Sequence, residues 1–94
     1  MATFILLSNL TDEGAKTIKT HPERIKAVDQ ELEQMGVHVV NQWATLGPYD
    51  FVNVVEAPDV QTIMRVSANL VARGTVRVTT LPALAVDEFI ASLK

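Results

Sequence analysis

The chain has 94 residues, of which 48% are hydrophobic, and this length corresponds to one small domain with a modest core. The net charge of −3, with only eight basic residues, argues against nucleic acid, because phosphates attract clusters of lysine and arginine. The absence of cysteine excludes disulfides, thiolate metal ligands and cysteine nucleophiles. No apolar stretch approaches the about 18 residues that span a membrane, and the N-terminus has no cationic leader, so we expect a cytoplasmic protein.

Apolar residues recur in four strand-like and three helix-like runs, which together predict a single domain over residues 1–94. The strand-like runs are residues 3–8, 37–46, 51–57 and 75–81. The helix-like runs are residues 20–35, 59–73 and 86–93. A weak helical turn is also expected around Ala15 and Ile18, between the first strand and the first helix.

Both long helices carry signals at their ends. Thr20 and Glu23 have the spacing of a capping box, and Asp59 lies near the positive N-terminal end of the second helix. Gly36 and Gly74 stand where a left-handed glycine commonly ends a helix. These signals place the two helices between the first and second strands and between the third and fourth.

This order predicts an α+β domain with the ferredoxin-like βαββαβ fold, in which a four-stranded antiparallel sheet carries two helices on one face and a short C-terminal helix follows. In simple register, residues 47–50 form a hairpin turn, and a mixed set of apolar and polar side chains shares one sheet face. We expect this face to be free of helices: His38, Val40, Gln42, Ala44, Leu46, Phe51, Asn53, Val55, Arg77 and Thr79. The face under the helices would then carry Val37, Val39, Trp43, Val52 and Val54, unless a one-residue bulge reverses part of the assignment.

A mixed face of this kind is too apolar for water and too polar for a core. Two copies of the chain are therefore expected to pack sheet against sheet, as a homo-oligomer with a polar-lined cavity for a small molecule between them.

Few residues suggest catalysis. His38 and Asp50 are the candidate bases, although a surface histidine and a turn aspartate are the commoner roles of such residues. The two histidines are not spaced as metal ligands, and no glycine-rich phosphate loop is present, so neither a metal nor a cofactor is expected. The candidates for ligand binding are aromatic and polar residues around the hairpin together with two arginines: Arg24, His38, Trp43, Tyr49, Asp50, Asn53 and Arg77.

Several separated segments resemble the GYD domain family. The hairpin segment 45–52 contains Gly47, Tyr49 and Asp50, and the segments 10–14, 22–25 and 74–77 resemble other common parts of the family, including Arg24 and Arg77. Pro48 is a departure, because family members usually carry a polar residue there. The resemblance implies a ferredoxin-like fold of the dimeric α+β barrel kind and says little about function.

Three functions fit these observations. The first is a homo-oligomeric module that binds a small molecule or interacts with another protein. The second is a cofactor-independent enzyme of the dimeric barrel type, monooxygenase- or isomerase-like, with His38 or Asp50 as its base. The third is an assembly unit whose tail helix docks onto a neighbouring subunit.

Overall fold

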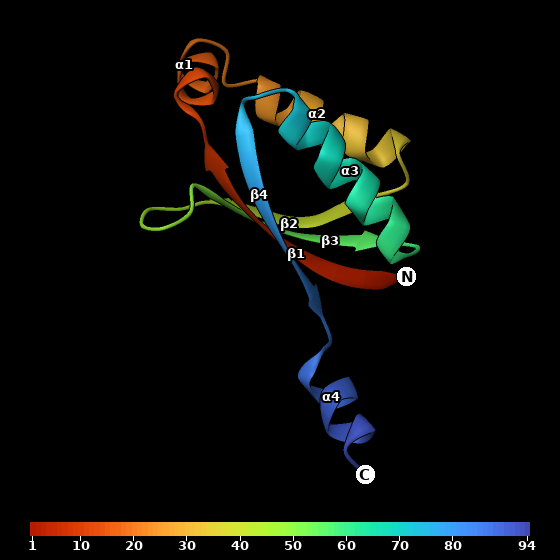
Figure 1. Ribbon diagram of the computed structural model, residues 1–94. Helices are drawn as coiled ribbons and strands as arrows, with labels where there is room; N and C mark the ends of the chain where they lie inside the picture. The colour runs from red at the N-terminus through yellow and green to blue at the C-terminus, as the bar shows by residue number, and fades with distance from the viewer.

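In the computed structural model, which describes all 94 residues, strands and helices follow one another in the order β-α-α-β-β-α-β-α (Figure 1). The strands are β1 (Ala2–Leu10), β2 (His38–Ala44), β3 (Phe51–Ala57) and β4 (Val76–Ala83). The helices are α1 (Asp12–Thr20), α2 (Arg24–Gln34), α3 (Val60–Ala72) and α4 (Val86–Ser92).

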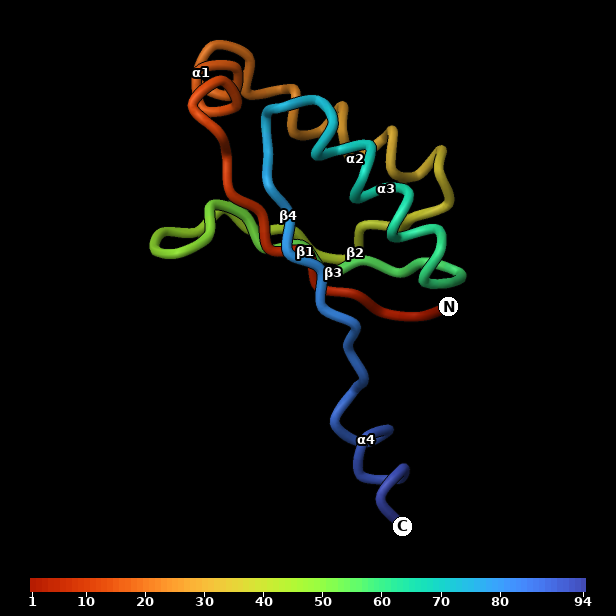
Figure 2. Tube along the Cα trace, viewed as in Figure 1, coloured from red at the N-terminus to blue at the C-terminus, as the bar shows by residue number.

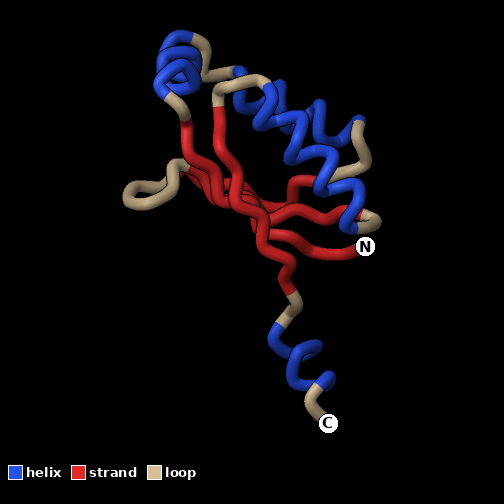
Figure 3. Tube along the Cα trace, in the orientation of Figure 1, coloured by secondary structure: helices blue, strands red, loops and turns tan.

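The four strands form one antiparallel sheet in the order β2-β3-β1-β4, and α2 and α3 lie side by side over one of its faces (Figures 1 and 3). The ferredoxin-like α+β fold predicted from the sequence is therefore confirmed. The central strand β1 is apolar on both faces, as expected for a strand with neighbours on both sides. Its Phe4 and Leu6 are buried under the helices, and Ile5 and Leu7 alternate with them on the opposite face.

The core lies between the sheet and the two long helices. Its buried residues are Phe4, Leu6, Leu32, Val37, Val55, Ala57, Ile63 and Val66. The predicted apolar stripe of α2 is confirmed, since Leu32 is buried and Val28 and Met35 pack against the core. The apolar surface expected on α3 divides in two: Ile63 and Val66 are buried and Leu70 packs against the core, whereas Val60, Met64 and Val71 are exposed.

Helix ends match the sequence signals in part. Gly36 and Gly74 have φ values of 88° and 76° and end α2 and α3, as predicted. Asp59 is the N-cap of α3, and its carboxylate accepts hydrogen bonds from the Thr62 backbone and hydroxyl. The predicted capping box is wrong, because Thr20 belongs to the preceding helix and its hydroxyl donates to the Lys16 carbonyl.

Helix α1 is also longer than the weak turn that was expected. It spans nine residues and has its own N-cap in Thr11.

The assignment of the two sheet faces was wrong in its main part. Gln42 pairs with Asn53 and Ala44 with Phe51, and this set lies on the helix-covered face, together with Val55. Trp43, Val52 and Val54 lie on the helix-free face instead. Arg77 and Thr79 lie on the helix-free face, as predicted.

A bulge at Val40 explains why β2 changes its pattern along its length. The register slips between Val39 and Asn41, so that Val39 pairs with Val55 and lies on the helix-covered face, as was predicted for Val37 and Val39. The helix-free face is consequently more uniformly apolar than expected. Its apolar residues are Ile5, Leu7, Trp43, Val52, Val54 and Leu81.

The C-terminal segment leaves the domain as a separate arm. Figure 2 shows that the chain continues past the end of β4 and carries α4 away from the sheet and the other helices. All residues from Leu84 to Lys94 are exposed. Pro82 does not end the last strand, as the sequence suggested, but pairs opposite Phe4. An edge strand tolerates this proline, because one side of the strand has no partner.

Candidate functional site

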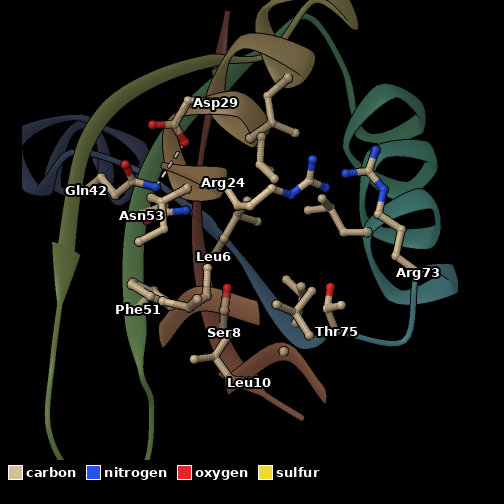
Figure 4. A pocket seen from close by; sticks show the side chains of 18 of the residues that line it. Leu6, Ser8, Leu10, Arg24, Asp29, Gln42, Phe51, Asn53, Arg73 and Thr75 are labelled. Atoms are coloured by element: carbon tan, nitrogen blue, oxygen red, sulfur yellow. Dashed lines mark hydrogen bonds between the residues drawn. The ribbon is translucent and has the colours of Figure 1, made fainter. Parts of the chain in front are cut away.

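A cavity of about 110 Å³ lies between the sheet and the helices of the domain body, and Figure 4 looks into it. Leu6, Phe51 and Val78 contribute to its sheet side, and Ile25 and Leu70 contribute from the helices. The volume is comparable to the about 150 Å³ of an engineered apolar cavity that holds benzene. The cavity therefore has room for one ring-sized group in apolar surroundings.

Polar side chains from three elements meet on one side of this cavity. Gln42 of β2 donates a hydrogen bond from Nε2 to Oδ1 of Asp29 on α2, at 3.0 Å, which is the dashed line in Figure 4. The Asp29 carboxylate also lies 4.0 Å from the Lys26 ammonium. Asn53 of β3 stands beside Gln42, and its Oδ1 is buried without any hydrogen-bond partner. A buried carbonyl oxygen that accepts no hydrogen bond is uncommon in folded proteins.

Two arginines meet on the other side. Arg24 is the first residue of α2 and Arg73 caps the end of α3, and Figure 4 shows their guanidinium groups directed toward each other. Arg73 forms an ion pair with Glu31, whereas Arg24 has no carboxylate within 4.0 Å. The two antiparallel helices place these positions together, because the start of one lies beside the end of the other.

Helix α1 closes one end of the cavity and is tied to the loop before β4. The Thr11 backbone N–H donates to the Thr75 carbonyl at 3.0 Å, and the Thr11 hydroxyl donates to the Gly74 carbonyl at 2.7 Å. Gly14, in the first turn, packs so closely on Thr75 that an added Cβ would overlap its carbonyl oxygen. Glycine at this position allows α1 to approach the end of β4.

The structure brings two of the seven predicted ligand-binding residues into the cavity, Arg24 and Asn53. His38 lies exposed at the start of β2, and its Nδ1 is 2.6 Å from Glu33 Oε1. Trp43 and Arg77 lie on the opposite face of the sheet.

The last two predicted residues, Tyr49 and Asp50, belong to the hairpin and hold its shape. The Tyr49 carbonyl accepts a hydrogen bond from the Thr45 hydroxyl at 2.6 Å. The Asp50 carboxylate accepts one from the Leu10 backbone at 2.8 Å. Neither candidate base, His38 or Asp50, lines the cavity.

Sequence reasoning missed six polar residues that line the cavity: Ser8, Thr17, Asp29, Gln42, Arg73 and Thr75. Arg73 carried a usable signal, because its place at the end of the second helix sets it opposite Arg24 in any ferredoxin-like fold. Asp29 carried none, since an aspartate among the other charged residues of this helix resembles any solvated charge. No group of three histidine, aspartate or glutamate side chains is arranged to hold a metal ion, and none of the helices has the length and hydropathy needed to cross a membrane.

The strand order, the two covering helices and the cavity between them define a ferredoxin-like α+β domain with an internal pocket. The model of the GYD domain family matches residues 4–93, and the chain belongs to this family. It is also 58% identical over 95 residues, covering all of both chains, to a Thermus thermophilus protein named glutamine synthetase and cystathionine beta-lyase binding protein. Among solved structures, it is similar to the Thermus thermophilus protein TTHA0845, with a TM-score of 0.57, 24% identity and coverage of 90% of this chain and 95% of that one. The latter similarity supports the fold alone.

Proposed function

We propose that the chain is a protein-interaction module that binds glutamine synthetase and cystathionine beta-lyase. The observation that carries this proposal is the 58% identity, without unmatched ends on either chain, to the Thermus protein named for binding these two enzymes. A module of this kind needs uncovered surface rather than a catalytic constellation. The chain offers two such surfaces, the helix-free face of the sheet and the C-terminal arm.

The helix-free face supports self-association. It is apolar across the sheet, and Trp43 on β2 and Leu81 on β4 are exposed by 51% and 42% in the single chain. Arg77 and Glu56 lie toward opposite ends of the same face, because they flank β1 opposite Asn9 and Thr3. Two copies packed with their strands antiparallel would bring the Arg77 end of one over the Glu56 end of the other. An apolar centre with complementary charges near its ends is the composition of a protein interface.

The C-terminal arm supports a second contact between copies. Helix α4 has only seven residues, and an isolated helix of this length is marginal in water. Its large apolar side chains Phe89 and Ile90 are 52% and 45% exposed in the single chain, so nothing within the chain stabilises this helix by packing. We propose that this apolar surface packs against a neighbouring copy of the chain. The assembled protein would then be the form that binds the enzymes, in the cytoplasm.

The alternative of a cofactor-independent enzyme receives less support. That function required a candidate base inside a cavity, and His38 instead pairs with Glu33 at the surface. Asp50 uses its carboxylate to bind the backbone of β1.

Binding of the purified chain to glutamine synthetase and to cystathionine beta-lyase tests the proposal, with the two enzymes taken from the organism that produces the chain. We expect saturable binding by isothermal titration calorimetry, and co-elution of chain and enzyme in size-exclusion chromatography. An unrelated enzyme of similar size and charge serves as the control. Absence of binding to both enzymes, with a chain that is folded by circular dichroism, would overturn the proposal.

A further inference from the structure

We propose that the cavity under α2 and α3 is a binding site for a small carboxylate whose apolar body is about the size of a benzene ring. This inference does not rest on the proposed binding of enzymes. It depends on three features of the cavity: an anion-attracting mouth, an apolar chamber and a buried oxygen that accepts no hydrogen bond.

The mouth selects for a negative charge. Arg24 and Arg73 direct two cations at the same space, and only one of them, Arg73, has an acidic partner in Glu31. Like charges that face each other repel, and an anion between them would relieve that repulsion. A guanidinium group binds a carboxylate through paired N–H donors, so a carboxylate at this mouth can be held by Arg24 and by Arg73.

The interior selects for the rest of the molecule. The chamber behind the arginines is lined by Leu6, Ile25 and Phe51, and its about 110 Å³ accommodates an aromatic ring or a branched aliphatic group. Beyond it, the buried Asn53 Oδ1 lacks a donor, which a hydroxyl or amine on the ligand would supply.

Asp29 fixes the direction of binding. Its carboxylate lies on the Gln42 side of the cavity and accepts the hydrogen bond from Gln42. A negative charge there would be repelled, so the ligand carboxylate belongs at the arginines and the donor group at Asn53. A ring with a carboxylate at one end and a hydroxyl at the other, as in 4-hydroxybenzoate, has this polarity.

Titration of the ¹⁵N-labelled chain with 4-hydroxybenzoate tests the site by nuclear magnetic resonance. We expect saturable shifts of the amide signals of Ser8, Asn53 and Val78, which line the cavity. The neutral analogue 4-hydroxybenzamide has nearly the same shape and should bind at least about tenfold more weakly, the effect of one charge-assisted contact.

Two variants separate the two halves of the site. Arg24→Gln lies at an exposed helix start, so it should leave the fold intact and weaken binding of 4-hydroxybenzoate by about tenfold. Asn53→Leu should weaken 4-hydroxybenzoate but not benzoate, which has no hydroxyl for Asn53. Arg77→Gln, on the opposite face of the sheet, is the matched control and should change nothing.

Three results would overturn the inference. One is equal affinity for the acid and the amide, and another is a set of shifts confined to the helix-free face around Trp43 and Val54. The third is the absence of saturable binding for 4-hydroxybenzoate, benzoate and 3-methylbutanoate at millimolar concentration. Since enzyme binding is measured in a separate titration, failure of this site and failure of the proposed function are distinguishable.

Discussion

The carboxylate of Asp50 accepts a hydrogen bond from the backbone N–H of Leu10, at 2.8 Å and across forty residues of chain. The Asp50 backbone N–H also donates to the Ser8 carbonyl, and its carbonyl accepts from Thr45. One residue thus joins the β2–β3 hairpin to the end of the central strand. The aspartate of the Gly47–Asp50 motif therefore has a structural role that its turn position alone did not reveal.

Replacing Asp50 with alanine is expected to lower the free energy of unfolding by about 1.5–3 kcal/mol, the usual range for a hydrogen bond to a charged group. The Leu10 N–H would lose its acceptor at a partly buried position. Asp50→Asn keeps an acceptor oxygen and should lose less. Urea denaturation followed by circular dichroism measures the difference, and Asp87→Ala, on the exposed arm, is the matched control. A loss for Asp50→Ala no larger than that of the control would contradict this role.

Gly14 is expected to be intolerant of any side chain. A Cβ at this position would overlap the carbonyl of Thr75, which is backbone and cannot rotate away. Gly14→Ala should therefore destabilise the fold by about 1–3 kcal/mol, the usual range for overpacking, although alanine is the better helix former. Lys16→Ala, on the exposed side of the same helix, should be neutral. Thermal unfolding of the two variants gives the comparison, and a neutral or stabilising Gly14→Ala would show that α1 does not press on Thr75.

The fold was accessible from the sequence because its signals are local. The period of the apolar residues located β3 correctly, and Gly36 and Gly74 marked the ends of α2 and α3. The boundary between α1 and α2 was less clear. Thr20 and Glu23 have the spacing of a capping box, but Thr20 is the last residue of α1 and Glu23 precedes the first residue of α2. Capping spacing alone cannot distinguish the last residue of one helix from the first cap of the next.

The candidate site was less accessible, because its position depends on which sheet face the helices cover. Gln42 and Asn53 were correctly placed on one face, but their polarity suggested that no helix would cover it. In the structure Asp29 of α2 satisfies Gln42, and a cavity remains beside Asn53. Val39, which was expected under the helices, does lie on this face, because the bulge at Val40 interrupts the alternation between Val39 and Gln42. The hydrogen bond between Gln42 and Asp29 joins two elements that are separate in the sequence, and the local pattern of residues contains no signal for it.

Asp59 gives the stability of α3 a dependence on pH. The hydrogen bonds from the Thr62 hydroxyl and backbone N–H lower the pKa of the Asp59 carboxyl from its ordinary value of 3.8. A lowered pKa in the folded state stabilises the protein above the unfolded value, and this contribution is lost as the pH falls through the folded value. Asp59→Ala should therefore melt several degrees below the wild type at pH 7, and the difference should shrink as the pH falls below 3.8. A difference in melting temperature that is independent of pH would contradict the role of the ionised carboxylate.

The helix-free sheet face is expected to hold two copies together. Leu81→Glu places a charge among the apolar residues of this face and should convert the oligomer to smaller species in sedimentation velocity. Met64→Glu is the matched control, because Met64 is also exposed and apolar but lies on α3, away from the sheet face. A dissociation caused by Met64→Glu and not by Leu81→Glu would move the interface from the sheet to the helices.

The C-terminal arm makes a different prediction, because it leaves the domain before it presents its apolar residues. Deleting residues 86–94 removes only exposed residues, so the melting temperature of the domain body should change little. If the arm docks onto a neighbouring copy, the deletion should lower the oligomer mass in sedimentation velocity while leaving the sheet-to-sheet pair intact. Phe89→Asp should have the same effect without shortening the chain, and Lys94→Ala should have none. An unchanged oligomer mass for both the deletion and Phe89→Asp would contradict docking of the arm onto another copy. Binding of the two variants to the enzymes would then test whether the arm contacts an enzyme instead.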